Sequence, residues 1–152
     1  QEILRHPHID PNKVRSETQT TPLYIAAYRG NVEVVRALAS HPKIKINLGL
    51  HGINASPLFV AAQEGHEMVI EELLRANKVD VNQSTDDGIT PLCQASSRGH
   101  EHVVTLLLNV AGLNVDHQTK NGATALSIAT SKKHTRIVDA IRTHLSKSAS
   151  QV

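Results

Sequence analysis

The sequence predicts an all-α protein, a solenoid of stacked helix–turn–helix units, and two features carry this prediction. The first is a short motif that occurs four times, with successive copies starting 35, 34 and 34 residues apart. The second is a helical spacing of apolar residues after every copy. A period of about 33 residues that opens with Thr-Pro-Leu is typical of stacked helix pairs. The four copies are Thr21-Pro22-Leu23, Ser56-Pro57-Leu58, Thr90-Pro91-Leu92 and Thr124-Ala125-Leu126.

Each motif marks the start of a short first helix. The hydroxyl of Thr21 can accept from the free N–H groups of the first turn, and Pro22 suits the first helical position. Leu23, Ala26 and Ala27 then face inward at helical spacing. A glycine in the left-handed conformation is expected to end this helix. The residues at that position are Gly30, Gly65, Gly99 and, in the last unit, Lys133.

A second helix follows each turn and begins at Asn31, His66, His100 or His134. Its apolar residues recur on one face, which we expect to be buried in the stack. This stripe consists of Val34, Val35 and Leu38; Val69, Ile70, Leu73 and Leu74; Val103, Val104, Leu107 and Leu108; and Ile137, Val138 and Ile141.

Polar connections join the units, with Asp-Gly at 87–88 and Asn-Gly at 121–122 as signals of a tight reversal. With the repeated opening, the Ala and Gly positions and the period, the chain resembles the ankyrin-repeat family over almost its whole length. The resemblance implies exposed β-hairpin-like loops, called fingers below, between the units. The finger at 48–54 holds one residue more than the finger that follows it.

The chain departs from the family pattern at several positions, among them the residue after Thr-Pro-Leu and the inter-helix Gly, which Lys133 replaces. The residue after Thr-Pro-Leu is usually His in the family, so its bond to the Thr is expected to be absent or replaced. In the last unit, positive φ at Lys133 would cost about 1 kcal/mol. The residues at the usual His position are Tyr24, Phe59, Cys93 and Ser127.

These patterns divide the chain into repeats. Residues 4–12 parallel residues 39–47 and 74–82, so we expect the chain to begin inside a repeat. A segment cut from a longer array and a naturally short N-terminal cap both explain this. The expected boundaries are the end of a preceding repeat at 1–19, repeats at 20–54, 55–88 and 89–122, a fourth repeat with a capping helix at 123–145, and a flexible tail at 146–152.

Composition excludes several classes of function. The 16 basic and 14 acidic residues nearly balance, which gives no reason to expect binding to nucleic acid or to an anionic membrane. No apolar run approaches the roughly 20 residues that span a bilayer. A single cysteine favours a reducing compartment, so we expect an intracellular, cytoplasmic protein.

The residues that could carry chemistry are better explained by the repeat. His66, His100 and His134 recur at the repeat period, too far apart for one zinc ion, because packed helices lie about 8–10 Å apart. Cys93 has no residue placed to activate it, and structural cysteine is the default. The glycines recur as turn residues and form no phosphate-binding loop. We therefore expect no catalytic residue, no cofactor and no metal.

Binding by the concave side is the use that the ankyrin resemblance implies. That side is built from finger tips and from the exposed ends of the first helices, and its residues vary between units. Tyr and Arg supply much of the energy at interfaces, which favours Tyr28, Arg29 and Arg98, with Ile53 as an exposed apolar contact. The candidate partner-binding residues are Tyr28, Arg29, Ile53, Gln63, Glu64, Asp86, Asp87, Ser97, Arg98, Lys120 and Lys132.

The sequence thus predicts a monomeric, non-catalytic module that binds another protein or a peptide. An alternative is the substrate-recruiting or host-target-recruiting segment of a larger multidomain enzyme or effector. A third is a structural spacer without a partner. Fold alone does not decide among these functions.

Overall fold

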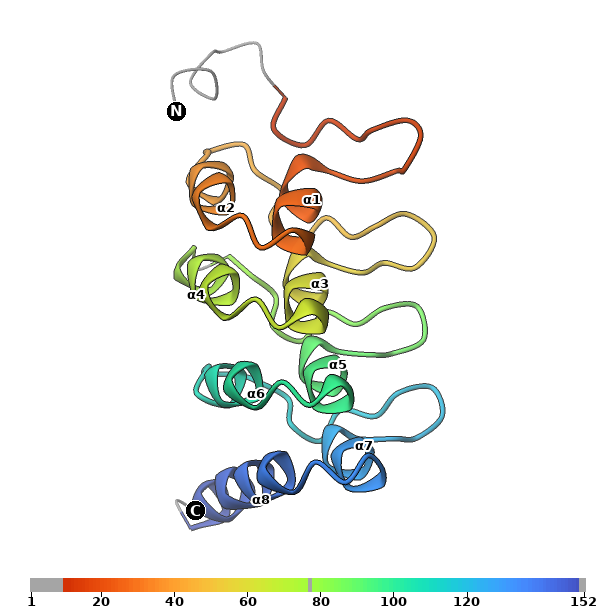
Figure 1. The fold of residues 1–152 in the computed structure, drawn as a ribbon, viewed down its shortest axis with the longest axis vertical. Coiled ribbons are helices and arrows are strands. Elements are labelled where there is room, and N and C mark those ends of the chain that lie inside the picture. The colour runs from red at the N-terminus through yellow and green to blue at the C-terminus, as the bar shows by residue number, and fades with distance from the viewer. Residues whose placement is uncertain (1–9, 77, 151–152) are drawn as a thin grey trace.

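Helix pairs and fingers form a single stack in the computed structural model, which describes residues 10–76 and 78–150. First helices form one row, second helices form another, and the fingers project sideways from the first row (Figure 1). Each helix packs on its partner and on its counterpart in the next unit, which confirms the predicted all-α solenoid. The helices are α1 Pro22–Tyr28, α2 Val32–Ala39, α3 Pro57–Glu64, α4 Glu67–Arg75, α5 Pro91–Arg98, α6 Glu101–Leu108, α7 Ala125–Ser131 and α8 Thr135–Ala149.

The helix starts follow the predicted capping chemistry. Thr21 accepts a hydrogen bond from the backbone N–H of Tyr24 at 3.1 Å, and the other three capping hydroxyls act in the same way. In the last unit Ser127 completes a capping box, because its hydroxyl accepts from the N–H of Thr124 at 2.9 Å. A serine therefore replaces the His–Thr bond of the family pattern in that unit.

Asparagine side chains join each unit to the next. Asn47 donates from Nδ2 to the carbonyl of Lys78 at 2.9 Å and accepts at Oδ1 from the N–H of Asp80 at 2.9 Å. One side chain thus satisfies a donor and an acceptor on the following unit. Asn12 bridges in this way to Lys43 and Lys45, and Asn82 to Gly112 and Asn114. We call these contacts the asparagine clamps.

A second set of contacts uses the histidines. His66 Nε2 lies 2.9 Å from the carbonyl oxygen of Tyr28 in the unit before it. Because a carbonyl only accepts, this nitrogen must carry the proton. His100 and His134 make the same contact with Gln63 and Ser97. These histidines are therefore bridges between units, a role that the sequence did not reveal.

The histidine rings explain the glycines at the preceding turns. Gly99 has φ +80°, and a Cβ added there would lie 2.8 Å from a ring carbon of His134. Glycine is thus required by both backbone conformation and space. Lys133 occupies the same position in the last unit with φ 62°, so it bears the expected backbone strain.

Two expectations need correction. Val34 was expected inside the stack but is 40% exposed, because α4, α6 and α8 each pack against the second helix before them, and no second helix precedes α2 among the described residues. The chain after 145 was expected to be a flexible tail, but α8 continues to Ala149. Residues 1–9, 151 and 152, which the predicted terminal segments include, lie outside the described residues.

The longer finger has a counterpart earlier in the chain. Residues 51–54 loop between the bridged pair Leu50 and Ala55, and residues 16–19 do the same between Arg15 and Thr20. Later fingers close over shorter loops, from Thr85 to Ile89 and from Thr119 to Ala123. Both of these fingers therefore hold an extra residue, which is not peculiar to 48–54.

The asparagine clamps generate a stability prediction. Asn82→Ala removes two inter-unit hydrogen bonds, so we expect the free energy of unfolding to fall by about 2 kcal/mol. Asp116 occupies the same register position in the third unit, and Asp116→Ala should change stability by less than about 0.5 kcal/mol. Urea unfolding of both variants checks this; equal losses would show that the clamp adds nothing.

The turn before α8 generates a second prediction. Lys133→Gly should raise the free energy of unfolding by about 1 kcal/mol, because glycine adopts positive φ without strain. Gly99→Ala adds a side chain at the same position one unit earlier. It should lower the free energy of unfolding by more than about 1 kcal/mol, because the methyl group also meets His134. Thermal unfolding gives both values, and a loss of stability in Lys133→Gly would contradict the strain argument.

Candidate partner-binding surface

The fingers and the first helices together form one side of the stack, which we call the finger–helix surface (Figure 1). Every candidate residue lies in one of its two rows. The finger row holds Ile53, Asp86, Asp87 and Lys120. The helix row lies at the C-terminal ends of α1, α3, α5 and α7 and holds Tyr28, Arg29, Gln63, Glu64, Ser97, Arg98 and Lys132.

Backbone hydrogen bonds bring neighbouring fingers together. The N–H of Asp86 donates to the carbonyl of Ile53 at 3.1 Å, and the N–H of Lys120 donates to the carbonyl of Asp87 at 3.0 Å. Each bond uses main-chain atoms only, and all four side chains are exposed. The finger row is therefore a continuous surface whose side chains are available to a partner.

The helix row contains a polar chain that centres on Gln63. Its Oε1 accepts from Gln94 Nε2 at 3.1 Å, and its own Nε2 donates to Glu64 Oε1 at 2.8 Å. Burial raises the pKa of the Tyr24 hydroxyl, and the nearby Tyr28 and Glu64 raise it further. That hydroxyl therefore remains neutral and can donate a hydrogen bond.

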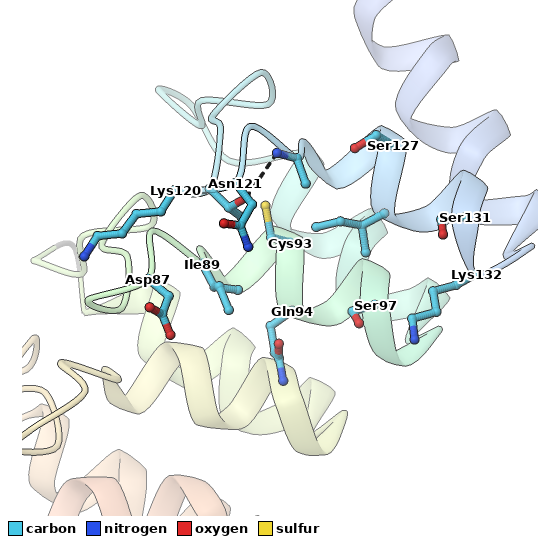
Figure 2. A pocket seen from close by; sticks show the side chains of 13 residues that line it. Asp87, Ile89, Cys93, Gln94, Ser97, Lys120, Asn121, Ser127, Ser131 and Lys132 are labelled. Carbon is cyan, nitrogen blue, oxygen red and sulfur yellow. Dashed lines mark hydrogen bonds between the residues drawn. The ribbon is translucent and has the colours of Figure 1, made fainter.

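A groove of about 800 Å³ lies between the third and fourth units on this surface (Figure 2). It brings together four of the candidates, Asp87, Ser97, Lys120 and Lys132. Lys120 and Lys132 stand at opposite ends of its lining (Figure 2). The other lining residues are Ile89, Cys93, Gln94, Thr119, Asn121, Ala123, Ser127, Ile128 and Ser131.

The remaining candidates do not line this groove. Tyr28 and Ile53 are 52% and 49% exposed, and Arg29 and Arg98 are exposed at the ends of α1 and α5. The side chains of Tyr28, Arg29 and Arg98 form no hydrogen bond or ion pair with another described residue. They therefore stand free on the finger–helix surface.

Two groove residues were missed at the sequence level although a signal was present. Gln94 is polar at a position where the other units have Ile25, Val60 and Ile128. Ser127 is small where the first two units have an aromatic ring. Comparing each register position across the four units would have identified both.

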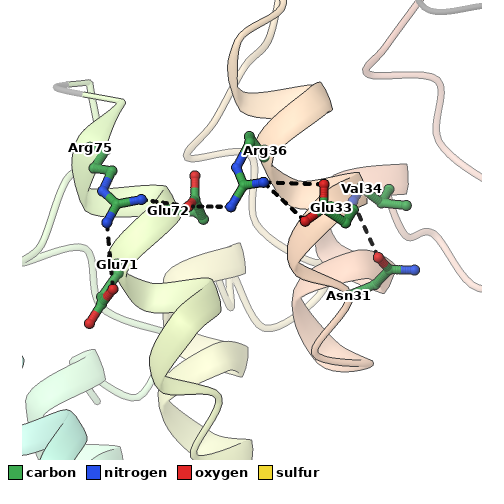
Figure 3. A network of polar contacts seen from close by, with 7 residues as sticks. All are labelled: Asn31, Glu33, Val34, Arg36, Glu71, Glu72 and Arg75. Atoms are coloured by element: carbon green, nitrogen blue, oxygen red, sulfur yellow. Dashed lines mark hydrogen bonds and ion pairs between the residues drawn. The ribbon is translucent and has the colours of Figure 1, made fainter. Parts of the chain in front are cut away.

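The opposite side of the stack carries an ion-pair network between the second helices (Figure 3). Glu72, whose side chain is only 9% exposed, accepts from Arg36 at 2.9 Å and from Arg75 at 2.6 Å. The hydrogen bond from Arg36, with the positive charges of both arginines, lowers the pKa of Glu72, and the same bond raises that of Arg36. The network joins α2 to α4 and lies away from the fingers.

A metal site would need histidine, cysteine or carboxylate side chains close together. Across 10–76 and 78–150, no three of them are grouped as a metal site requires. Cys93 is 1% exposed and packs in the core, where burial makes thiols inert. In the same part of the chain, no helix has both the length and the apolar character needed to cross a membrane.

Stacked helix pairs with projecting fingers define a helical repeat protein as the class. A model of three-copy ankyrin repeats matches residues 1–85 and again residues 58–149. The chain therefore belongs to the ankyrin-repeat family, whose members are generally protein–protein interaction modules with a typically non-catalytic fold. Comparison with curated proteins gives no match.

The Glu72 network generates a pH prediction. A carboxylate with a lowered pKa stabilises the fold fully above its ordinary pKa of 4.5, and this contribution is lost as the pH falls through the lower folded value. Glu72→Gln should therefore be less stable at neutral pH and should lose less further stability below about pH 4.5. Unfolding curves over this range, with exposed Glu67→Gln as control, test it; parallel curves for Glu72→Gln and the wild type would refute the linkage.

Proposed function

We propose that this chain is a non-catalytic module that binds a partner protein or peptide on its concave face, which the finger–helix surface forms. The observation that carries the proposal is the contrast between constant, buried positions and variable, exposed positions within the repeat. Ala26, Val35, Leu38 and their counterparts are buried in all four units, whereas the finger tips and the ends of the first helices vary and are mostly exposed. A surface with variable chemistry on a constant frame suits specific recognition.

Aromatic and arginine side chains favour Tyr28, Arg29 and Arg98 as the main contacts. Such residues dominate interface energies because a large area and several donors are desolvated at once. Ile53 adds an exposed apolar side chain on the finger row. A partner that spans these residues would contact the first three units and both rows.

The module should act as a monomer in the cytoplasm, either alone or as the recruiting part of a larger protein. In both settings the partner would bind the same surface. We therefore assign the recognition step to this chain and no chemical step.

A variant with Tyr28→Ala, Arg29→Ala and Arg98→Ala tests the surface. We expect it to fold like the wild type, because all three side chains are exposed, and to lose at least about tenfold in affinity, or about 1.4 kcal/mol. A partner is first captured with the wild type and identified, and its affinity for each variant is then measured by calorimetry.

The matched control carries Met68→Ala, His102→Ala and Arg142→Ala, three exposed positions on the second helices. It should retain the wild-type affinity. Undiminished binding by the folded first variant, or an equal loss in the control, would reject the assignment of the partner to the finger–helix surface.

A further inference from the structure

We infer that the groove between the third and fourth units recognises an acidic segment of the partner protein. An apolar side chain of that segment rests on Ile89 and Ile128, and a neighbouring carboxylate binds Lys132. This inference rests on the proposed function, because it names the chemistry of a partner that occupies the same surface.

The groove exists because, at one position of the repeat, the side chain is smaller in the last two units than in the first two. The residue after Thr-Pro-Leu is Tyr24 in the first unit and Phe59 in the second, but Cys93 and Ser127 in the last two. Cys93 and Ser127 both line the groove, and neither can fill the space that a ring would take. The two small side chains therefore leave an opening at this end of the finger–helix surface.

The lining combines an apolar part with an excess of hydrogen-bond donors. Ile89 and Ile128 are half-buried and face the groove beside Ala123, which suits one aliphatic side chain. Around them stand ammonium, hydroxyl and amide groups that can donate to an anion. These donors belong to Gln94, Ser97, Lys120, Asn121, Ser131 and Lys132, whereas the Ser127 hydroxyl already donates to the carbonyl of Thr124.

The charged residues of the lining favour one end of the groove for the carboxylate of the bound segment. Asp87 is the acidic residue of the lining and lies at the Lys120 end (Figure 2), where it opposes a second anion. At the other end Lys132 stands near the hydroxyl-bearing residues Ser97 and Ser131 (Figure 2). A carboxylate there can accept from the ammonium group and from a hydroxyl together.

The wider charge distribution supports an acidic occupant. Residues 117–150 contain six basic and one acidic residue, whereas residues 78–116 contain two basic and five acidic. The basic stretch 117–150 therefore attracts an acidic segment, while the net negative charge of 78–116 repels a uniformly charged polyanion such as a nucleic acid. A protein segment that mixes apolar and acidic residues fits both the apolar lining and the basic end of the groove.

The test uses an array of short peptides that each carry a leucine flanked by glutamate, together with twins in which glutamine replaces glutamate. The peptides retained best by the wild type are then measured individually by fluorescence anisotropy at physiological salt. We expect each glutamate peptide to bind at least about tenfold more tightly than its twin, a difference of about 1.4 kcal/mol.

Two variants examine the two halves of the groove. Lys132→Glu should abolish the preference for glutamate, and Ser127→Phe should abolish binding by filling the apolar part. Ser127→Ala loses the same capping bond to Thr124, so its thermal unfolding gives the stability effect to be subtracted. Lys43→Glu, which makes the same charge change at an exposed site in the first connection, should bind like the wild type.

Several results would overturn the inference: retention of no peptide by the wild type, equal affinity for the twins, full binding by Lys132→Glu, or an equal loss in Lys43→Glu. Binding of a single-stranded oligonucleotide in place of the peptides, with its loss in Lys132→Glu, would overturn it as well. If the captured partner binds Lys132→Glu normally but not the triple-alanine variant, only the groove assignment fails. If neither variant affects that partner, the proposed function fails too.

Discussion

Contacts from each unit to its immediate neighbour are the constraint on which this structure depends. An asparagine side chain holds both an N–H and a carbonyl of the next unit, with distances between 2.7 and 2.9 Å at all three clamps. Histidine bridges repeat the principle at the turn between the two helices. Because these bonds end on main-chain atoms, they fix the spacing of the units whatever side chains the outer rows carry.

This separation of roles explains how the surface acquires its chemistry. The capping hydroxyls, the turn glycines and the apolar stripe are committed to the frame, so changes at those positions reduce stability. Side chains on the fingers and at the ends of the first helices are not needed for the frame in this way. Where a framework position does change, as in the shift from Phe59 to Cys93 and Ser127, it reshapes the surface and opens the groove.

Local chemistry made much of the fold predictable from the sequence. Caps, prolines and glycines act within a few residues, so the starts of the first helices and the positive φ at Gly65 could be inferred directly. The partners of Asn47 and His66 lie more than 30 residues away, and no local pattern reveals them. Exposure of Val34 likewise depends on which helix lies next to α2.

The candidate site was predictable in outline only. Counting from each Thr-Pro-Leu opening places the eleven candidates on one surface, but it does not show that Asp87, Ser97, Lys120 and Lys132 share a groove while Tyr28 and Arg98 stand outside it. Those relations depend on side-chain size at positions that had been assigned to packing. Gln94 was overlooked for the same reason, because its position is apolar in every other complete unit.

Amide hydrogen exchange of the chain, free and with its captured partner bound, tests the central claim most directly. The account predicts slower exchange in the finger loops and at the C-terminal ends of α1, α3, α5 and α7, with no change along the outer faces of α2, α4, α6 and α8. Slower exchange confined to the second helices would contradict it, because the partner would then bind the side of the stack that carries the Glu72 network.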